Sequence, residues 1–378
     1  MTVSDLTERE LVARIHARLP AAPEWMVVGV GDDAAVVEPV RNRLEVLSVD
    51  AVVDGVHFDR AFTPPAAIGH RALAVNLSDL AAMGAAPRLA LLSLALPRTF
   101  PLQDFDDMIA SLTTLAARTR LTIAGGNLTH IDGPLVLDIT VVGTVKRRQV
   151  MTRDGARPGD ELYVTGSIGA AAAGLQILKS TVVSRQPSVD SHQSPISGDP
   201  PRSDDAERSA TAEPSATGER STTDCGLTTD NWRLAGDSLI RRYLYPEPRL
   251  RLGTLLGRNR AASACMDLSD GLGEAVHQLA EASGVGATID AGALPIEPDA
   301  RRWFETRRHD AVQEALVGGD DYELLIAVRP RLRRRLTAAV RHGEAPLTRI
   351  GACTAEREII IRHDGAARPM PRGFTHFR

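Results

Sequence analysis

Five short acidic motifs, spread over most of the chain, hold the residues best suited to chemistry. They are Gly29–Asp33, Ser48–Asp50, Asn76–Asp79, Asp267–Gly271 and Gly318–Glu323. Most adjoin apolar runs, where a carboxylate without a partner is costly. Divalent cations would satisfy several carboxylates at once, and Mg²⁺ bound to polyphosphate is a common arrangement of this kind. The motifs therefore predict a site for Mg²⁺ and a polyphosphate substrate.

Asp79 has the most informative position of these carboxylates. It recurs with apolar residues every three or four positions between Ile68 and Met83, which places it on the apolar face of a helix. A charge on that face must be paired or bound to a metal ion. The alternative is that Asp79 caps a second helix that begins at Leu80.

Each of the other acidic motifs also has a structural alternative. Asp32 and Asp33 follow glycines, as turn residues do. Asp50 ends an apolar strand, where either a turn residue or a ligand-binding residue is expected. Ser269 or Asp270 could cap the helix expected over 271–282, but capping does not account for both Asp267 and Asp270.

Two glycine pairs could let backbone N–H groups approach phosphate closely, although each could also form a simple tight turn. They are Gly125–Gly126, followed by Asn127, and Gly318–Gly319. Neither a Walker A motif nor a dinucleotide-binding glycine motif occurs in the chain, so a P-loop enzyme and a Rossmann dehydrogenase are not supported. We expect the basic run Arg329–Arg335 to form one solvated helix face.

Composition limits the class of protein. The 378 residues are enough for two domains, and a net charge of −4 gives no reason to expect a nucleic-acid partner. The first residues lack a signal-peptide pattern, and the longest apolar run, near Leu89–Leu96, is too short to span a membrane. Cys225, Cys265 and Cys353 show neither metal-binding nor disulfide spacing, so we expect a cytoplasmic location and no membrane partner.

Hydrophobic periodicity predicts alternating helices and strands, and therefore an α+β fold of α/β two-layer type. Expected helices cover 5–20, 65–83 (ended by Gly84), 170–178 and 239–244, and expected strands cover 43–53, 121–123, 135–145 and 161–165.

A run of turn residues at 153–160 suggests a boundary between two domains, 1–150 and 151–378. The second domain is interrupted at 180–231, where Ser, Thr, Pro, Asp and Arg dominate and large apolar residues are scarce. Such a segment cannot bury enough surface to offset its conformational entropy. We therefore expect a disordered insertion there.

In their order and separation, these motifs resemble those of the thiamine-monophosphate kinase family. This family belongs to a superfamily with aminoimidazole ribonucleotide synthetase and selenophosphate synthetase. The resemblance covers 1–179 and 232–378, and its most specific parts are Ala74–Gly84, Asp267–Leu272 and Gly318–Leu324. Thr152–Asp160 and Gly373–Phe377 are also family-like.

The resemblance implies a PurM-like fold and a known reaction. An N-terminal mixed-sheet domain would bind ATP and Mg²⁺ and would form a homodimer through its sheet, and a C-terminal α/β domain would complete the site. The reaction moves the γ-phosphoryl group of ATP to thiamine monophosphate, which gives thiamine diphosphate.

The resemblance also implies roles for individual residues. The implied Mg²⁺ ligands are Asp33, Ser48, Val49, Asp50, Asp79, Asn127, Asp267 and Asp270, of which Asp50, Asp79 and Asp270 would be catalytic. The implied ATP contacts are Gly126, Asn127, Arg153 and Ser269, and the implied thiamine-phosphate contacts are His57, Asp320 and Phe374.

Three of these positions depart from the family pattern. Asn127 stands where the family usually has Asp, Val49 where it often has Thr, and Asp320 where Glu is usual. Two alternatives to the kinase remain: a sister ATP-dependent synthetase with another acceptor, and a nucleotide-binding relative without catalysis, which Asn127 and Val49 suggest.

Overall fold

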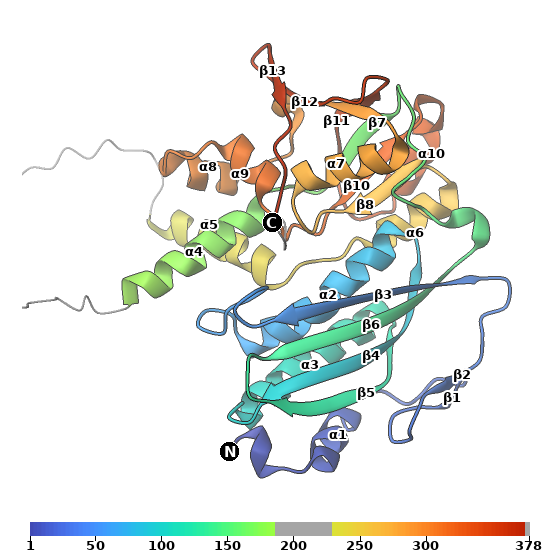
Figure 1. The fold of residues 1–378 in the computed structure, drawn as a ribbon, viewed down its shortest axis with the longest axis vertical. Helices are drawn as coiled ribbons and strands as arrows, with labels where there is room; N and C mark the ends of the chain where they lie inside the picture. The colour runs from blue at the N-terminus through green and yellow to red at the C-terminus, as the bar shows by residue number, and fades with distance from the viewer. Residues whose placement is uncertain (186–228, 375–378) are drawn as a thin grey trace, which may run out of the picture.

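The structure is a computed structural model that describes residues 1–185 and 229–374. In this part of the chain, two larger sheets lie one beyond the other, and each is packed against helices (Figure 1). The combination of mixed sheets and helices confirms the expected α+β class. No helix in these described ranges is both long and apolar enough to cross a membrane.

The N-terminal sheet has four strands in the order β3-β6-β4-β5. They are β3 (Leu44–Val53), β4 (Ala86–Pro97), β5 (Thr122–Ile131) and β6 (Val136–Val145). Strands β4 and β5 are parallel and the other pairs are antiparallel. Helices α2 (Pro65–Ala82) and α3 (Leu102–Thr119) cover one face of this mixed sheet (Figure 1).

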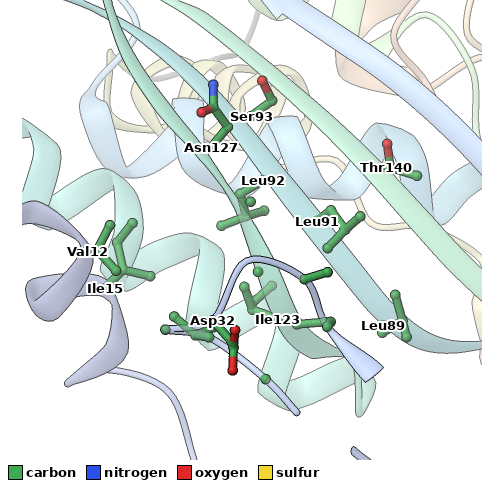
Figure 2. Close-up of a pocket in the computed structure, with 18 of the residues that line it drawn as sticks. Val12, Ile15, Asp32, Leu89, Leu91, Leu92, Ser93, Ile123, Asn127 and Thr140 are labelled. Carbon is green, nitrogen blue, oxygen red and sulfur yellow. The ribbon is translucent and has the colours of Figure 1, made fainter. Parts of the chain in front are cut away.

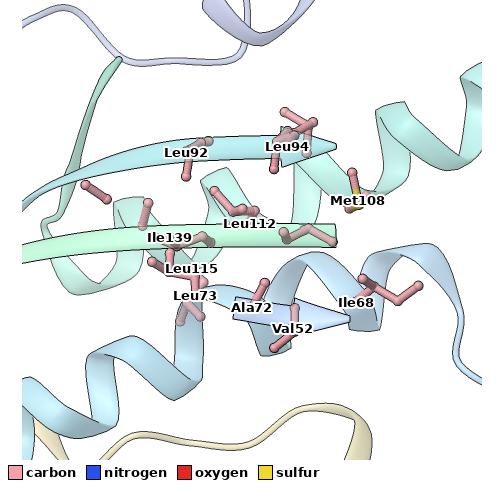
Figure 3. Close-up of a cluster of buried hydrophobic side chains, with 14 of the residues drawn as sticks. Val52, Ile68, Ala72, Leu73, Leu92, Leu94, Met108, Leu112, Leu115 and Ile139 are labelled. Atoms are coloured by element: carbon pink, nitrogen blue, oxygen red, sulfur yellow. The ribbon is translucent and has the colours of Figure 1, made fainter. Parts of the chain in front are cut away.

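The core of this half lies between the sheet and the two helices. Figure 3 shows Leu92 and Ile139 from the strands packed against Leu73 and Leu112 from the helices. The helices approach one another closely because α2 contains Gly69, where a Cβ atom would lie 2.0 Å from the carbonyl oxygen of a residue of α3. These two helices do not cover the opposite face of the sheet, which is therefore available for a binding site.

The C-terminal sheet has seven strands in the order β13-β12-β9-β11-β7-β10-β8. The strands are β7 (Glu161–Thr165), β8 (Ala264–Asp267), β9 (Gly286–Asp290), β10 (Leu324–Val328), β11 (Leu347–Thr354), β12 (Ile359–His363) and β13 (Ala366–Pro369). The helices of this half are α4 (Ala170–Arg185), α5 (Thr229–Leu244), α6 (Leu250–Asn259), α7 (Leu272–Ser283), α8 (Pro298–Thr306), α9 (Ala311–Val317) and α10 (Arg333–Val340).

The remaining elements are short. Strands β1 (Met26–Val28) and β2 (Val36–Val37) form a two-stranded antiparallel sheet. Turns of 3₁₀ helix occur at Val3–Asp5, Arg147–Gln149, Ala291–Ala293 and Pro330–Leu332. Helix α1 (Glu8–His16) is shorter than the helix predicted over 5–20. It begins late because Thr7 caps it, in a reciprocal pair of hydrogen bonds with Glu10.

Three predicted elements are longer in the structure. Strand β5 continues through the glycine pair that could have formed a turn, and a bulge in β5 just before this pair, opposite Ala90 and Leu91 of β4, accommodates it. Helix α4 continues past 178 to Arg185, and α5 begins at Thr229, ten residues before the predicted start. The ends of the predicted insertion 180–231 are therefore helical, and its residues 186–228 lie outside the described residues. The proposed division at residue 150 falls between the two sheets and stays a prediction.

Candidate active site

Helix α2 holds the first carboxylates of the site in place. Asn76 is fully buried, accepts a hydrogen bond from the backbone N–H of Asp50 at 3.0 Å, and donates one to the carbonyl of Asp50 at 3.3 Å. The hydroxyl of Ser48 donates to the carboxylate of Asp79. Because α2 is continuous from Pro65 to Ala82, Asp79 lies inside the helix and does not cap a second one.

Strand β8 brings a third carboxylate to α2 from the other half of the molecule. Asp267, the last residue of β8, is 5% exposed and accepts a hydrogen bond from the hydroxyl of Ser78 at 2.7 Å. Ser269 and Asp270 follow in the turn before α7. Gly271 takes the N-cap position with φ 94° and no side chain caps the helix, so the capping alternative for these two residues is wrong.

The carboxylates of this cluster repel one another. Withdrawal from water, and then repulsion from three other aspartates beginning with Asp79, raise the pKa of Asp50 to about 6. Burial and then repulsion from Asp79 raise the pKa of Asp267 to about 7, although Arg153 opposes this rise. The cluster therefore holds more negative charge than the neighbouring guanidinium neutralises.

The chemistry of these residues fits Mg²⁺. Oδ1 of Asp138, an electrostatic neighbour of Asp50, is buried and has no hydrogen-bond partner among the described residues. Over the same residues, no group of three or more His, Cys, Asp or Glu side chains is arranged to enclose one metal ion. Mg²⁺ usually takes one or two carboxylates and completes its shell with water and substrate phosphate, so the fit rests on the clustered carboxylates of Asp50 and Asp267 and on the unpartnered oxygen of Asp138.

A cavity of about 780 Å³ lies on the outer face of the N-terminal sheet, between the strands, α1 and the loop at 29–35. Figure 2 shows Asn127, Ser93 and Thr140 on the strands, with Asp32 on the loop beyond. Leu89, Leu91 and Ile123 supply apolar walls (Figure 2). The cavity is large enough for a nucleotide.

Strand register explains how the polar residues of this cavity come together. Ser93 of β4 pairs with Asp138 on one side and with Asn127 on the other, so the three residues form a row across the sheet. Gly126 also lines the cavity, and a Cβ atom there would lie 1.9 Å from the carbonyl oxygen of Leu92. Glycine is thus required where β5 passes close to β4, just after the bulge in β5.

Three of the implied Mg²⁺ ligands lie apart from the acidic cluster, and one of them, Asn127, lies on β5 in the wall of the cavity. Asp33 lies on the exposed loop that borders the cavity. Val49 has a side chain that is 57% exposed and points to the outer face of β3. Because side chains alternate along a strand, its neighbours Ser48 and Asp50 point to the opposite face, toward α2.

Two of the three implied thiamine-phosphate contacts border the Asp267–Gly271 turn. The N–H of Asp320 donates to the carbonyl of Ser269 at 2.8 Å, and the N–H of Phe374 donates to that of Asp270 at 3.1 Å. The third, His57, lies in the loop between β3 and α2, where Nδ1 accepts a hydrogen bond from a backbone N–H at 3.1 Å.

Arg71 is a neighbour of the site that the sequence analysis missed. Its buried guanidinium pairs with Asp320 and donates to the carbonyl of Tyr243 at 2.9 Å. It also lies over the ring of Tyr243, 4.7 Å from the centroid. Arg71 thus joins α2 to the loop before β10.

Known proteins resemble this chain in sequence and in structure. The family described as AIR synthase related protein matches with its N-terminal domain at residues 31–145 and its C-terminal domain at 209–364. The thiamine-monophosphate kinase of Escherichia coli K12 is 34% identical over 374 residues, which is 98% of each chain.

Two solved structures are similar over almost their whole length. The crystal structure of thiamine-monophosphate kinase from Stenotrophomonas maltophilia K279a has a TM-score of 0.72 and 32% identity, with 96% of this chain and 98% of that chain covered. The structure of AaThiL complexed with AMPPCP and TMP has a TM-score of 0.68 and 26% identity, with 100% and 99% covered.

Proposed function

The chain belongs to the thiamine-monophosphate kinase family of AIR synthase related proteins, and we propose that it transfers the γ-phosphoryl group of ATP to thiamine monophosphate. The product is thiamine diphosphate. The observation that carries this function is the convergence of Asp50, Asp79 and Asp267 from both halves of the molecule. The related AaThiL, which was crystallised with AMPPCP and TMP, supports both substrates.

ATP would occupy the cavity on the outer face of the N-terminal sheet. Gly126 and Asn127 line it, and Asp138 lies both on its wall and beside Asp50. Asp50, Asp79 and Asp267 do not line this cavity, so Asp138 is proposed to connect it with the acidic cluster, where the triphosphate would lie. Arg153, whose charge acts on Asp79 and Asp267, and Ser269 would meet it there.

The residues proposed to hold Mg²⁺ are Asp33, Ser48, Asp50, Asp79, Asp267 and Asp270, with Asn127 and the carbonyl of Val49 as neutral ligands. When bound, Mg²⁺ supplies positive charge between two polyanionic substrates. Hydrogen bonds from Ser48, Asn76 and Ser78 fix the cluster beforehand, so little reorganisation is needed during the transfer.

The acceptor needs no general base from the protein. A phosphate monoester has its second pKa near about 6, so its oxygen is anionic and nucleophilic at neutral pH. The work of the chain is then to orient the acceptor in line with the γ-phosphoryl group. Asp320, Phe374 and His57 are proposed to hold thiamine monophosphate, since two of them border the Asp267–Gly271 turn.

The proposal includes a homodimer that forms through the N-terminal sheet. Leu47 and Val49 of β3 are large apolar residues on its outer face, with exposed fractions of 66% and 57%. Such a patch is typical of a protein interface. A cytoplasmic location is also part of the proposal, and it is supported by Cys265 and Cys353, which are buried free thiols.

The decisive experiment is an assay of ADP release by the purified chain with ATP, Mg²⁺ and thiamine monophosphate. The kinase requires turnover that depends on both the acceptor and the metal, with thiamine diphosphate as product. Turnover with a different phosphate acceptor would instead indicate a sister synthetase. ATP binding without ADP formation would indicate a non-catalytic relative, the alternative suggested by Asn127 and Val49.

A further inference from the structure

A second polar depression lies at the far end of the C-terminal sheet from the active site. It has a volume of about 570 Å³ and is lined by Arg260, Arg329, Arg331 and Arg335, together with smaller residues. Arg329 follows the last residue of β10, whereas Asp320 precedes the first. Five strand residues extend over about 17 Å, so the two sites are separate.

The local backbone places these arginines around one depression. The run Arg329–Arg335 was expected to form one solvated helix face, and that expectation is wrong. A 3₁₀ turn over Pro330–Leu332 comes first and α10 begins only at Arg333. Arg331 and Arg335 thus reach the depression from two different elements, while Arg333 turns away and pairs with Glu161.

The charge of the depression is uncompensated. No ion pair forms at Arg260, Arg329, Arg331 or Arg335 within the described ranges, and no carboxylate lines the depression there. Nε of Arg329 is shielded from water and has no hydrogen-bond partner among those residues. A buried donor without an acceptor is costly, and an anion in the depression would remove that cost.

Asp160, an acidic group next to the wall of the depression, is already hydrogen-bonded. The hydroxyl of Ser263, which lines the depression, donates to Asp160 at 2.6 Å. Asp160 is 3% exposed and also accepts a hydrogen bond from the backbone N–H of Arg157 at 3.1 Å. Asp160 carries one negative charge and does not line the depression, whereas four arginines do line it.

We propose that this basic depression, formed by Arg260, Arg329, Arg331 and Arg335, is a binding site for a small oligophosphate anion. Guanidinium groups form paired, charge-assisted hydrogen bonds with phosphate oxygens. Several such groups around one depression suit a ligand with several phosphate charges. The site is distinct from the acidic cluster, which repels anions when no metal is bound.

The test is a calorimetric titration of the full chain with inorganic pyrophosphate, in low-salt buffer that contains EDTA. Without metal, the catalytic cluster does not attract the probe. We expect one site in the unmodified protein, and binding at least about tenfold weaker in the double variant R331A/R335A, because two charge-assisted contacts are lost. Both residues are exposed, so this variant should keep the melting temperature of the unmodified chain.

The matched control is R334A, which removes a charge from the same run at an exposed residue outside the depression. Its affinity for pyrophosphate should stay within about twofold, since only distant, screened charge changes. Absence of binding to the unmodified chain would overturn the proposal. So would full affinity in R331A/R335A, or an equal loss of affinity in R334A.

Discussion

The carboxylate of Asp50 lies among other aspartates. We expect it to destabilise the metal-free fold and to promote catalysis. We expect Asp50→Ala to lower the rate of ADP formation by at least about a hundredfold, because a charge that aligns two phosphates is lost. Without metal, the melting temperature should stay equal or rise, because repulsion from Asp79 and Asp270 is relieved. Kinetics and thermal unfolding in EDTA measure the two effects. Normal turnover would exclude Asp50 from the metal cluster.

Arg71 is expected to act on the acceptor through Asp320. A lysine at this position cannot both pair with Asp320 and donate to the carbonyl of Tyr243 in the same geometry. We therefore expect Arg71→Lys to raise the KM for thiamine monophosphate about tenfold and to leave the KM for ATP within about twofold. Steady-state kinetics with each substrate varied in turn check this split.

The control for Arg71 is Arg118→Lys. Arg118 pairs with Glu247 at the surface, where both side chains are about half exposed, and such pairs contribute little. It should leave both KM values unchanged. An equal rise in the two KM values of Arg71→Lys would show that Arg71 only supports the fold.

The sequence predicted the role of a single residue where that residue type is energetically unfavourable at its position. Asp79 stood out because a charge falls on the apolar face of a helix, and the structure places it beside Ser48. Asn76, Ser78 and Arg71 did not stand out, because each becomes informative only through a partner that is distant in the sequence. Ser78 meets Asp267, for example, 189 positions away.

At the level of elements, the N-terminus of α4 should make stability depend on pH. Asp321 accepts hydrogen bonds from the N–H groups of Gly169 and Ala171. Burial nevertheless raises its pKa to about 7, and Glu323 adds to this rise while Arg242 opposes it. The folded protein thus favours the protonated form of Asp321. Its contribution to the free energy of unfolding is full below about pH 4 and is lost as pH rises to about 7.

Asp321→Asn should remove this pH dependence. Relative to the unmodified chain, the variant should gain stability between pH 4 and pH 7, by roughly 2–4 kcal/mol at most. Urea unfolding of both proteins across this range measures the difference. A constant difference in unfolding free energy would show that Asp321 is ionised throughout.

Elements could be predicted where one local pattern dominated. Strand β7 matches its predicted range because turn residues precede it and glycine follows, and Gly84 ends α2 near the predicted point. The glycine pair 125–126 was ambiguous, because a glycine serves a turn and a close strand contact equally well. Only the pairing with β4, a tertiary feature that includes a bulge in β5, decides that it lies within β5.

At the level of the whole molecule, the exposed apolar face of the N-terminal sheet predicts self-association. Leu47→Glu would place a carboxylate in that face, so we expect the dimer to dissociate into monomers in analytical ultracentrifugation. Val56→Glu is the control, because Val56 is 62% exposed but lies in a loop after β3. A dimer that persists in Leu47→Glu would place the interface elsewhere.

The predicted insertion is best tested by removing it. Helices α4 and α5 pack against each other on either side of residues 186–228, so their contact should hold the chain ends in place without the segment. A Gly-Ser linker of about ten residues between Arg185 and Thr229 has an end-to-end distance of about 17 Å. Since the closure entropy of a loop changes slowly with its length, we expect the shortened chain to keep its melting temperature within about 3 °C and its kcat within about twofold. Loss of folding, or of turnover with the fold intact, would instead assign the segment a role in the structure or in the reaction.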